Sequence, residues 1–131
     1  YTLLVKSHVY HWNLVGPLFI PLHHLTEEHY KDLFEAVDII AERIRALGKR
    51  APLSFAQLLA KASVEEETAN RSAEDMVFQL VDDHEQLSKH IREAALLADD
   101  ADDLVTADML TARLAFHEKA IWMLRATLGQ A

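Results

Sequence analysis

The stretch from His23 to Gly48 contains no proline, and its only glycine is the last residue, so nothing in it interrupts a helix. Arg43 and Arg45 come shortly before Gly48, and basic residues followed by glycine are typical of a helix C-terminus. We therefore predict one long helix over residues 23–48, roughly 40 Å in length at 1.5 Å per residue. The rest of the chain is organised around this helix.

Two pairs of possible metal ligands lie on this helix, His23 with Glu27 and Asp38 with Glu42. Each pair is spaced i,i+4, so its members share one patch of helix surface. His23 and Asp38 are separated by roughly 22 Å of helix, so one copy cannot wrap both pairs around one ion. The residue numbers of His23 and Glu42 have the same sum as those of Glu27 and Asp38. Two antiparallel copies about a two-fold axis near residues 32 and 33 would therefore carry two identical mixed sites.

Composition excludes several classes of protein. With 131 residues the chain is long enough for a proper core, and we expect residues 1–131 to form a single domain. Acidic residues number 21 against 13 basic ones, and the formal charge of −8 disfavours nucleic-acid binding and favours cations. No run approaches the roughly 18 apolar residues of a membrane span, and no signal peptide is visible. The chain has no cysteine, which excludes disulfides and thiolate metal sites and fits a cytoplasmic location.

The N-terminal segment, residues 1–13, is also predicted to be helical, because Leu4, His8, His11 and Val15 fall on an a/d-like stripe. At about 20 Å it is short beside the next helix, and it lacks a start methionine and an N-cap signal. We therefore expect the chain to begin partway through its first helix.

Ser54 and Gln57 form a capping box that predicts a short helix ending near Lys61. The polar residues 63–71 that follow are predicted to be a loop.

Ser72 with Asp75 is predicted to cap a third long helix, and a fourth is expected from about Thr106, after an acidic connection at residues 99–103. No segment alternates like a strand, so the predicted fold class is all-α, a four-helix bundle with a short extra helix between its second and third helices. His84 and His117 fall on the inward stripes of the last two helices. We interpret them as hydrogen-bonded core histidines rather than ligands.

Imidazole and carboxylate groups suit iron and similar divalent ions, and five residues supply them in the pattern described. Carboxylates four residues apart on a helix usually form a solvated face, and a single histidine on a stripe is more often a core residue. Two observations favour metal binding. Asp38 lies within an otherwise apolar run, where a merely solvated acid is less expected. A solvated face would also not explain why the two pairs are spaced symmetrically about residues 32 and 33. The five candidates are His11, His23, Glu27, Asp38 and Glu42.

A set of short motifs runs in order along nearly the whole chain: His11-Trp12-Asn13, Gly16-Pro17, Phe19, His23, Glu27, Asp38 to Arg43, Leu47-Gly48, Ala62 to Glu65, Thr106 to Leu110 and Ile121 to Leu124. Their order and spacing resemble the Dps family, the small ferritin-like proteins that store iron. The resemblance implies a ferritin-like four-helix bundle in which twelve subunits, paired about two-fold axes, form a hollow shell.

The resemblance also implies a function. Members of this family oxidise Fe(II), preferably with hydrogen peroxide, store the ferric mineral in the shell and so protect DNA from oxidative damage. By correspondence, one subunit would supply His11, His23 and Glu27 to an inter-subunit ferroxidase site, and its neighbour Asp38 and Glu42. Iron is the expected metal, and zinc is a possible substitute.

Three further sets of residues have two interpretations each. Trp12 resembles a family tryptophan thought to intercept stray oxidising equivalents, and packing at the dimer interface explains it equally well. His8 is expected beside the ligands rather than among them. Asp99, Asp103 and Asp108 correspond to acids that line a three-fold pore for ferrous ions, whereas a charged run is otherwise usually a solvated loop.

Three alternatives remain. Ordinary ferritins and bacterioferritins use a Glu-x-x-His pair within one subunit, and no glutamate of this chain has histidine three residues later. A nucleoid-associated protein that mainly compacts DNA would need a lysine-rich tail, and neither end of this sequence shows one. A purely structural bundle with an acidic stripe is the third alternative.

Overall fold

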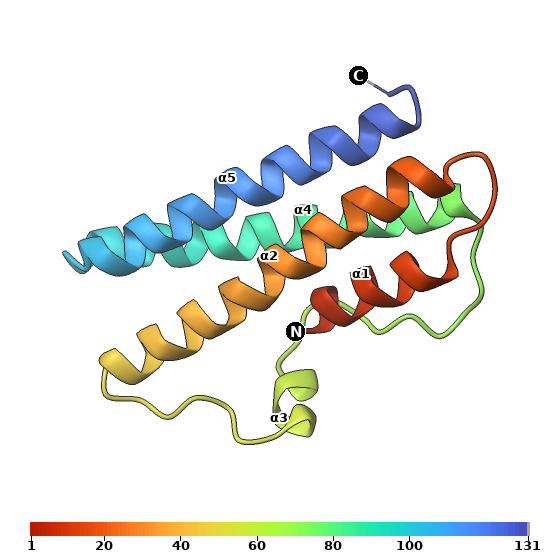
Figure 1. Cartoon of the computed structure of the whole chain (residues 1–131). Helices are drawn as coiled ribbons and strands as arrows, with labels where there is room; N and C mark the ends of the chain where they lie inside the picture. Colours follow the sequence, from red (N-terminus) through yellow and green to blue (C-terminus); the bar gives the residue numbers. More distant parts are fainter. Residues whose placement is uncertain (131) are drawn as a thin grey trace. The chain divides into compact units, whose positions relative to one another are not determined.

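The computed structural model describes residues 1–130, and within these residues all regular structure is helical (Figure 1). The chain divides into two compact units, Tyr1–Met76 and the part that begins at Val77. The prediction of four long helices with a short one after the second is confirmed. The helices are α1 (Thr2–Asn13), α2 (Phe19–Ala46), α3 (Phe55–Ala60), α4 (Ala73–Asp100) and α5 (Leu104–Thr127).

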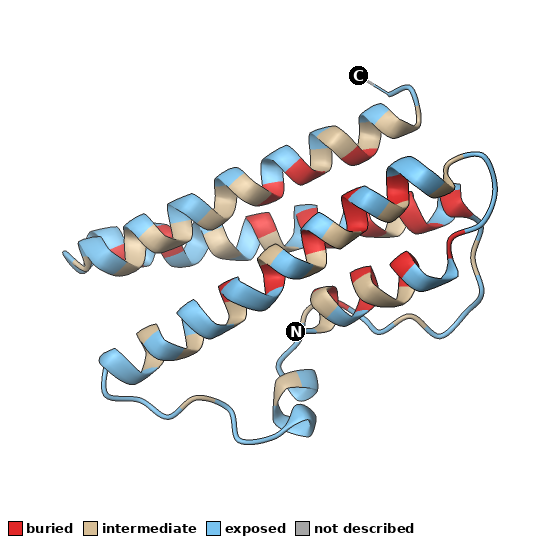
Figure 2. Cartoon of the chain, viewed as in Figure 1, coloured by how far each residue is buried: buried red, intermediate tan, exposed pale blue. Residues whose placement is uncertain are grey.

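Helices α1 and α2 pack against each other as an antiparallel hairpin in the first unit (Figure 1). The helix predicted at the N-terminus is confirmed, and its buried side is one position away from the a/d-like stripe, because Leu3, Ser7 and Tyr10 are buried whereas Val15 is exposed. Figure 2 shows buried positions along one side of α1. Of the predicted stripe, only His11 is buried. Two neighbouring stripes of α1 are nearly equally apolar, so contacts with the rest of the unit decide which one turns inward.

Helix α2 begins at Phe19, four residues before its predicted start at His23. Pro21, a residue type that usually marks a helix boundary, is the third residue of the helix. A proline is tolerated there because the first backbone N–H groups of a helix have no acceptor within the helix. The helix continues regularly beyond it, with the Leu22 N–H donating to the Leu18 carbonyl at 3.1 Å.

The C-terminus of α2 is formed by Gly48, as predicted. Gly48 has a φ of +79°, a left-handed conformation that glycine adopts without steric cost. The N–H of Lys49 donates to the Ile44 carbonyl at 3.1 Å, and that of Gly48 to the Arg45 carbonyl at 2.9 Å. This pair of hydrogen bonds satisfies two of the last carbonyls of the helix.

The short helix α3 is capped as predicted, because the Ser54 hydroxyl accepts from the Gln57 N–H at 3.3 Å. The reciprocal bond of the capping box is displaced by one residue. Gln57 Oε1 accepts from the backbone N–H of Leu53 at 2.8 Å rather than from that of Ser54.

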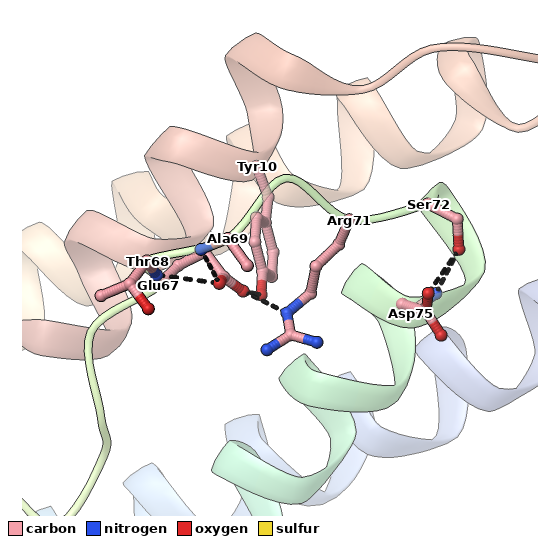
Figure 3. Close-up of polar contacts among 7 residues, drawn as sticks. All are labelled: Tyr10, Glu67, Thr68, Ala69, Arg71, Ser72 and Asp75. Carbon is pink, nitrogen blue, oxygen red and sulfur yellow. Dashed lines mark hydrogen bonds and ion pairs between the residues drawn. The ribbon is translucent and has the colours of Figure 1, made fainter.

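One carboxylate organises the loop between α3 and α4, which was predicted only as a polar loop. Glu67 accepts hydrogen bonds from the N–H groups of Thr68 and Ala69, from Nε of Arg71 at 2.5 Å and from the Tyr10 hydroxyl (Figure 3). Burial opposes ionisation of Glu67, but these hydrogen bonds, with that of Tyr10 foremost, outweigh burial and lower its pKa to about 2. Because Tyr10 precedes His11, this carboxylate fixes the part of α1 that carries a candidate ligand.

The second unit contains α4 from Val77 onwards and the whole of α5, and a tight turn joins the two helices. Helix α4 begins after Ser72, whose hydroxyl accepts from the Asp75 N–H at 3.1 Å as predicted (Figure 3). Ion pairs then join α4 to α5, between Arg92 and Glu118 at 2.7 Å and between Glu85 and Arg125.

The acidic connection is shorter than predicted, because α4 runs through Asp100 and α5 begins at Leu104 rather than near Thr106. Asp102 adopts a φ of +56°, and the Asp103 N–H donates to the Ala98 carbonyl at 2.9 Å, so the turn closes without glycine. The Asp103 carboxylate caps α5 by accepting from the Thr106 N–H at 3.0 Å.

Over the described part of the chain, every helix is too short or too polar to cross a membrane.

Candidate metal centre

The hairpin of α1 and α2 brings two of the predicted ligands, His11 and His23, into direct contact. Their rings are stacked with centroids 3.7 Å apart and planes 17° from parallel. His11 Nδ1 lies 2.9 Å from the backbone carbonyl oxygen of His23, and His23 Nδ1 lies 3.1 Å from that of His11. The two histidines are therefore held by a reciprocal pair of hydrogen bonds between side chain and backbone.

These hydrogen bonds select one tautomer of each neutral ring. A carbonyl oxygen can only accept, so each Nδ1 must donate. In the neutral imidazole the other nitrogen, Nε2, then carries the lone pair that binds a metal ion. The Thr26 hydroxyl, itself bonded to the Leu22 carbonyl at 2.7 Å, lies 3.5 Å from His11 Nδ1 on the buried side of the pair. In this tautomer both candidate ligands keep Nε2 free of the hydrogen bond that Nδ1 makes.

Glu27 follows His23 by one turn of α2 and is half-buried. Its carboxylate is bonded to the Lys31 ammonium at 2.5 Å, and this bond lowers the pKa of Glu27 below its ordinary value. The lowered pKa favours the ionised form of Glu27, a candidate ligand whose carboxylate is paired with the Lys31 ammonium.

The remaining predicted ligands, Asp38 and Glu42, are exposed on α2 and do not join this group. Because α2 is one continuous helix, Asp38 lies roughly 22 Å along it from His23. Within the described residues, no three histidines or acids of one chain come together in a way that could hold a metal ion. One chain therefore brings together only part of the predicted set.

The four predicted ligands of α2 nevertheless share one side of the helix. At about 100° per residue they fall within an arc of roughly 100°, together with two apolar residues. Those two residues, Ile20 and Phe34, are 60% and 65% exposed. Large exposed apolar side chains between polar ones are typical of an interaction surface. We call this the ligand face, defined by Ile20, His23, Glu27, Phe34, Asp38 and Glu42.

Aromatic rings surround the histidine pair on the side of α1. His8 is stacked on Tyr30 at 4.2 Å between centroids and lies 4.1 Å from Trp12. Tyr30 in turn meets His11 edge to face at 5.3 Å. The ring centroids of His8 and His11 are 6.2 Å apart, and the role of His8 beside the ligands stays a prediction. Trp12 is 62% exposed.

Comparison with known proteins places this arrangement in a family. The family model described as a ferritin-like domain matches residues 1–131. An uncharacterised low temperature-induced protein of Nostoc is 45% identical over 96% of this chain and 72% of its own length. A DNA protection during starvation protein of Brevibacillus brevis is 42% identical over 96% of this chain and 85% of its own. The crystal structure of a Dps protein from Bacillus brevis superimposes with a TM-score of 0.93 at 42% identity, covering 97% of this chain and 85% of that one.

The chain belongs to the Dps family of ferritin-like proteins. The Dps structures confirm the predicted fold class, a ferritin-like four-helix bundle with a short helix between its second and third helices. The resemblance inferred from the motifs is confirmed as well. The ligand set is a separate matter, because family membership does not test which residues bind the metal.

The acids proposed for a Dps pore lie in the second unit. Asp99 is exposed in the last turn of α4, and Asp108 is exposed on α5. Asp103 is half-buried and uses its carboxylate to cap α5. The pore assignment stays a prediction, and for Asp103 any such role would be added to a structural one.

His84 and His117 are buried, at 0% and 2% exposure, and their Nδ1 atoms are 2.8 Å apart. One of these atoms must donate to the other, so the two neutral rings have opposite tautomers. The structure therefore agrees with the interpretation of both as hydrogen-bonded core histidines.

Sequence reasoning missed three side chains at the centre, Thr26, Tyr30 and Lys31. Tyr30 and Lys31 lie three and four residues after Glu27, so helical spacing alone would have placed them beside it. Thr26 had no such signal, because its contact with His11 depends on how α1 packs against α2.

Proposed function

We propose that two copies of this chain pair antiparallel along α2 and form two identical sites that oxidise Fe(II). In each site, His11, His23 and Glu27 of one copy face Asp38 and Glu42 of the other. Membership of the Dps family supports iron storage and protection of DNA in broad terms. The observation that carries the site is the histidine pair, whose Nδ1 atoms are both occupied by backbone carbonyls.

The ligand face supports the pairing. It has the symmetry that an isologous interface requires, since a two-fold axis near residues 32 and 33 sets His23 opposite Glu42 and Glu27 opposite Asp38. Burying the exposed Ile20 and Phe34 against a second copy removes apolar surface from water and so stabilises the pair. The same pairing adds the two acids that one chain does not bring to its histidines.

The stacked rings favour two ions rather than one. An imidazole binds metal along the plane of its ring, and planes only 17° from parallel with centroids 3.7 Å apart cannot converge on one point close to both nitrogens. Each histidine is therefore suited to a different ion. Sites that hold two metal ions separate them by roughly 3.5–4 Å, which is comparable to the spacing of these rings.

A site for two ferrous ions suits hydrogen peroxide as the oxidant. Each Fe(II) gives up one electron, and peroxide takes both electrons with two protons to form two molecules of water. A lone Fe(II) would instead transfer one electron and release hydroxyl radical. Oxygen and nitrogen ligands suit iron in both oxidation states, and zinc can occupy the same donors without being oxidised. The acids at residues 99, 103 and 108 would draw ferrous ions into a twelve-subunit shell, where the ferric product is stored.

Protection of DNA follows from this chemistry, because the reaction consumes Fe(II) and peroxide together. Direct compaction of DNA is the other candidate function. The formal charge of −8 makes it unfavourable, since binding to duplex DNA depends on cationic side chains. A gel-shift assay of this 131-residue chain at about 150 mM salt is expected to show no complex with duplex DNA.

Anaerobic titration tests the oxidation chemistry. Fe(II)-loaded protein is mixed with known amounts of peroxide, and ferric ion is followed by absorbance. Two Fe(II) consumed for each peroxide is the expected result, and a ratio of one would contradict a paired site. Anomalous scattering from crystals soaked with Fe(II) locates the ions. Iron bonded to Nε2 of His11 or His23 supports the assignment, and iron bound only elsewhere overturns it.

A further inference from the structure

Lys31 lies on α2 one turn after Glu27 and on the same side of the helix as the predicted ligands. At about 100° per residue it falls within the arc of the ligand face, between the directions of Asp38 and Glu42. Its ammonium nitrogen Nζ lies 2.5 Å from Oε1 of Glu27. A candidate metal ligand therefore has a cationic partner on the side of the helix where a metal ion would bind.

The Glu27 carboxylate cannot serve an ammonium and a metal ion equally well. Metal binding uses a lone pair of a carboxylate oxygen, and Lys31 already uses one at Oε1. An ion bound through the other oxygen would still lie close to the ammonium. Repulsion between a divalent ion and an ammonium is twice that between two unit charges at the same distance, and it is stronger near a protein surface than in bulk water. Metal binding to Glu27 therefore favours departure of Lys31.

Lys31 is free to move away from Glu27 when this happens. Its side chain is 63% exposed, whereas that of Glu27 is 35% exposed. A lysine ammonium is strongly hydrated and is carried by a flexible stem of four carbons, so it can turn into water. An exposed ion pair of this kind contributes little to stability. Displacing Lys31 should therefore weaken metal binding at Glu27 without preventing it.

The proposed pairing of two copies adds a second effect of the same ammonium. Lys31 is close to the two-fold axis near residues 32 and 33, and Glu27 faces Asp38 of the second copy. Two facing carboxylates repel each other, and the ammonium of Lys31 neutralises one of them. Lys31 should therefore favour the pairing of the two acids while it competes with a metal ion for Glu27.

We propose that Lys31 sets the affinity of the iron site, as a built-in competitor whose ammonium exchanges with the metal ion at the Glu27 carboxylate. This inference rests on the proposed function, which makes Glu27 a ligand. An ion that binds Glu27 displaces the ammonium, and the ammonium returns when the ion leaves. A site that passes its iron on to a store benefits from this exchange, because the departing ion leaves no unpaired carboxylate.

Calorimetric titration of the assembled protein with zinc tests the inference, because zinc binds the same donors without being oxidised. Lys31→Gln is expected to tighten zinc binding by about two- to fivefold, the range that loss of an exposed ion pair allows. Lys31→Arg keeps a cation on Glu27 and should bind zinc no more tightly than wild type. Lys89→Gln, which replaces an exposed lysine of α4, removes the same charge elsewhere as a control. Unchanged zinc affinity in Lys31→Gln, or an equal gain in Lys89→Gln, overturns the proposal.

Two further measurements separate exchange at Glu27 from a general effect of charge or of stability. In a Glu27→Gln background the effect of Lys31→Gln on zinc affinity should disappear, because the carboxylate for which the two cations compete is absent. An effect of the same size in that background contradicts the proposal. The rise in Tm that zinc produces should be larger in Lys31→Gln than in wild type, since a tighter ligand stabilises the folded state more. An equal or smaller rise also contradicts it.

The Glu27→Gln variant separates this inference from the proposed function. If Glu27→Gln weakens zinc binding and Lys31→Gln leaves it unchanged, the role of Lys31 is wrong and the metal site stands. If Glu27→Gln leaves zinc binding unchanged, Glu27 is not a ligand and the proposed site itself fails.

Discussion

Two helical hairpins of this protein each carry a pair of histidines, and the two pairs are bonded in different ways. In the hairpin of α1 and α2, His11 and His23 each direct Nδ1 at the other's backbone carbonyl. In the hairpin of α4 and α5, His84 and His117 direct their Nδ1 atoms at each other. In the first pair the backbone selects one tautomer for both rings. In the second pair each ring determines the tautomer of the other.

The difference teaches how one residue type serves two purposes. Both rings of the first pair have an Nε2 suited to a metal ion, and ionised Glu27 lies beside them. The second pair is completely buried, with 0% and 2% exposure, and its mutual hydrogen bond satisfies polar atoms within a core. Histidines at helical spacing are therefore separated into candidate ligands and core residues by their hydrogen-bond acceptors rather than by their position in the sequence.

The largest expected effect concerns the first pair and the acids that complete its site. One variant replaces His23 and Glu27 with alanine, and another replaces Asp38 and Glu42. Each alone should lose fast iron oxidation, because neither homodimer keeps a complete site. With random pairing after co-expression, half of the dimers are mixed and each rebuilds one site of two, so activity should return to about a quarter of wild type if sites are independent. Peroxide-driven oxidation by purified mixed shells measures the recovery.

The control for this experiment replaces Glu28 and Glu35, two exposed acids of α2 outside the ligand face, and should keep full activity. Mixed shells that stay as inactive as both parents would show that the site does not lie between subunits.

The second pair should affect stability and leave the iron chemistry unchanged. His84→Leu removes the hydrogen bond that a buried His117 Nδ1 makes, at an expected cost of about 1–3 kcal/mol in the free energy of unfolding. Denaturant unfolding measures this cost, with His90→Leu, an exposed histidine of α4, as the control. A loss of iron oxidation in folded His84→Leu would contradict the separation of the two pairs.

Replacing Glu67 tests how much its hydrogen bonds with Tyr10 and Arg71 stabilise the fold. Glu67→Gln should lower the free energy of unfolding at neutral pH by roughly 1–3 kcal/mol, because the hydrogen bonds from Tyr10 and Arg71 lose an ionised acceptor. Denaturant unfolding measures the loss, and Glu66→Gln, an exposed neighbour, removes the same charge as a control.

The same variant has a predicted pH dependence. The pKa of Glu67 is about 2 in the folded chain, against roughly 4.3 for an unfolded glutamate. Its contribution is therefore fully present above about pH 4.3 and is lost as the pH falls towards 2. The stability difference between wild type and Glu67→Gln should shrink over that window, and a constant difference would show that ionisation of Glu67 is not its source.

The smallest expected effect lies in the turn of the second hairpin. Asp103→Ala removes the N-cap of α5 and should cost about 1 kcal/mol, whereas Asp103→Asn keeps a capping oxygen and should cost much less. Thermal unfolding compares the two, with Asp108→Ala as an exposed control. If Asp103→Ala and Asp103→Asn lowered the free energy of unfolding equally, the capping role would be contradicted. Because asparagine preserves the cap, the double variant Asp103→Asn with Asp108→Asn removes only the charge of the proposed pore. Slower iron uptake in this double variant would support the pore.

Local signals in the sequence were sufficient for the helices and most of their ends. Ser54, Ser72 and Gly48 act through backbone groups a few residues away, so their effect does not depend on distant packing. The start of α2 was predicted late because Pro21 reads as a helix breaker, although the first turn of a helix tolerates it. The acidic turn was predicted too long because Asp102 takes the place that glycine usually has.

For the candidate site, the sequence alone gave the candidate ligands of α2, their i,i+4 spacing and the fact that one helix cannot close around both pairs. The tertiary structure decided that the ring of each of His11 and His23 is hydrogen-bonded to the other's backbone carbonyl. It also decided that His8 stacks on Tyr30 and that Glu67 accepts a hydrogen bond from Tyr10. These contacts join residues that are 12 to 57 positions apart, so they depend on how α1, α2 and the loop approach one another. Helical periodicity describes the faces of single helices, and it contains no information about which faces meet or which nitrogen of a histidine finds a carbonyl.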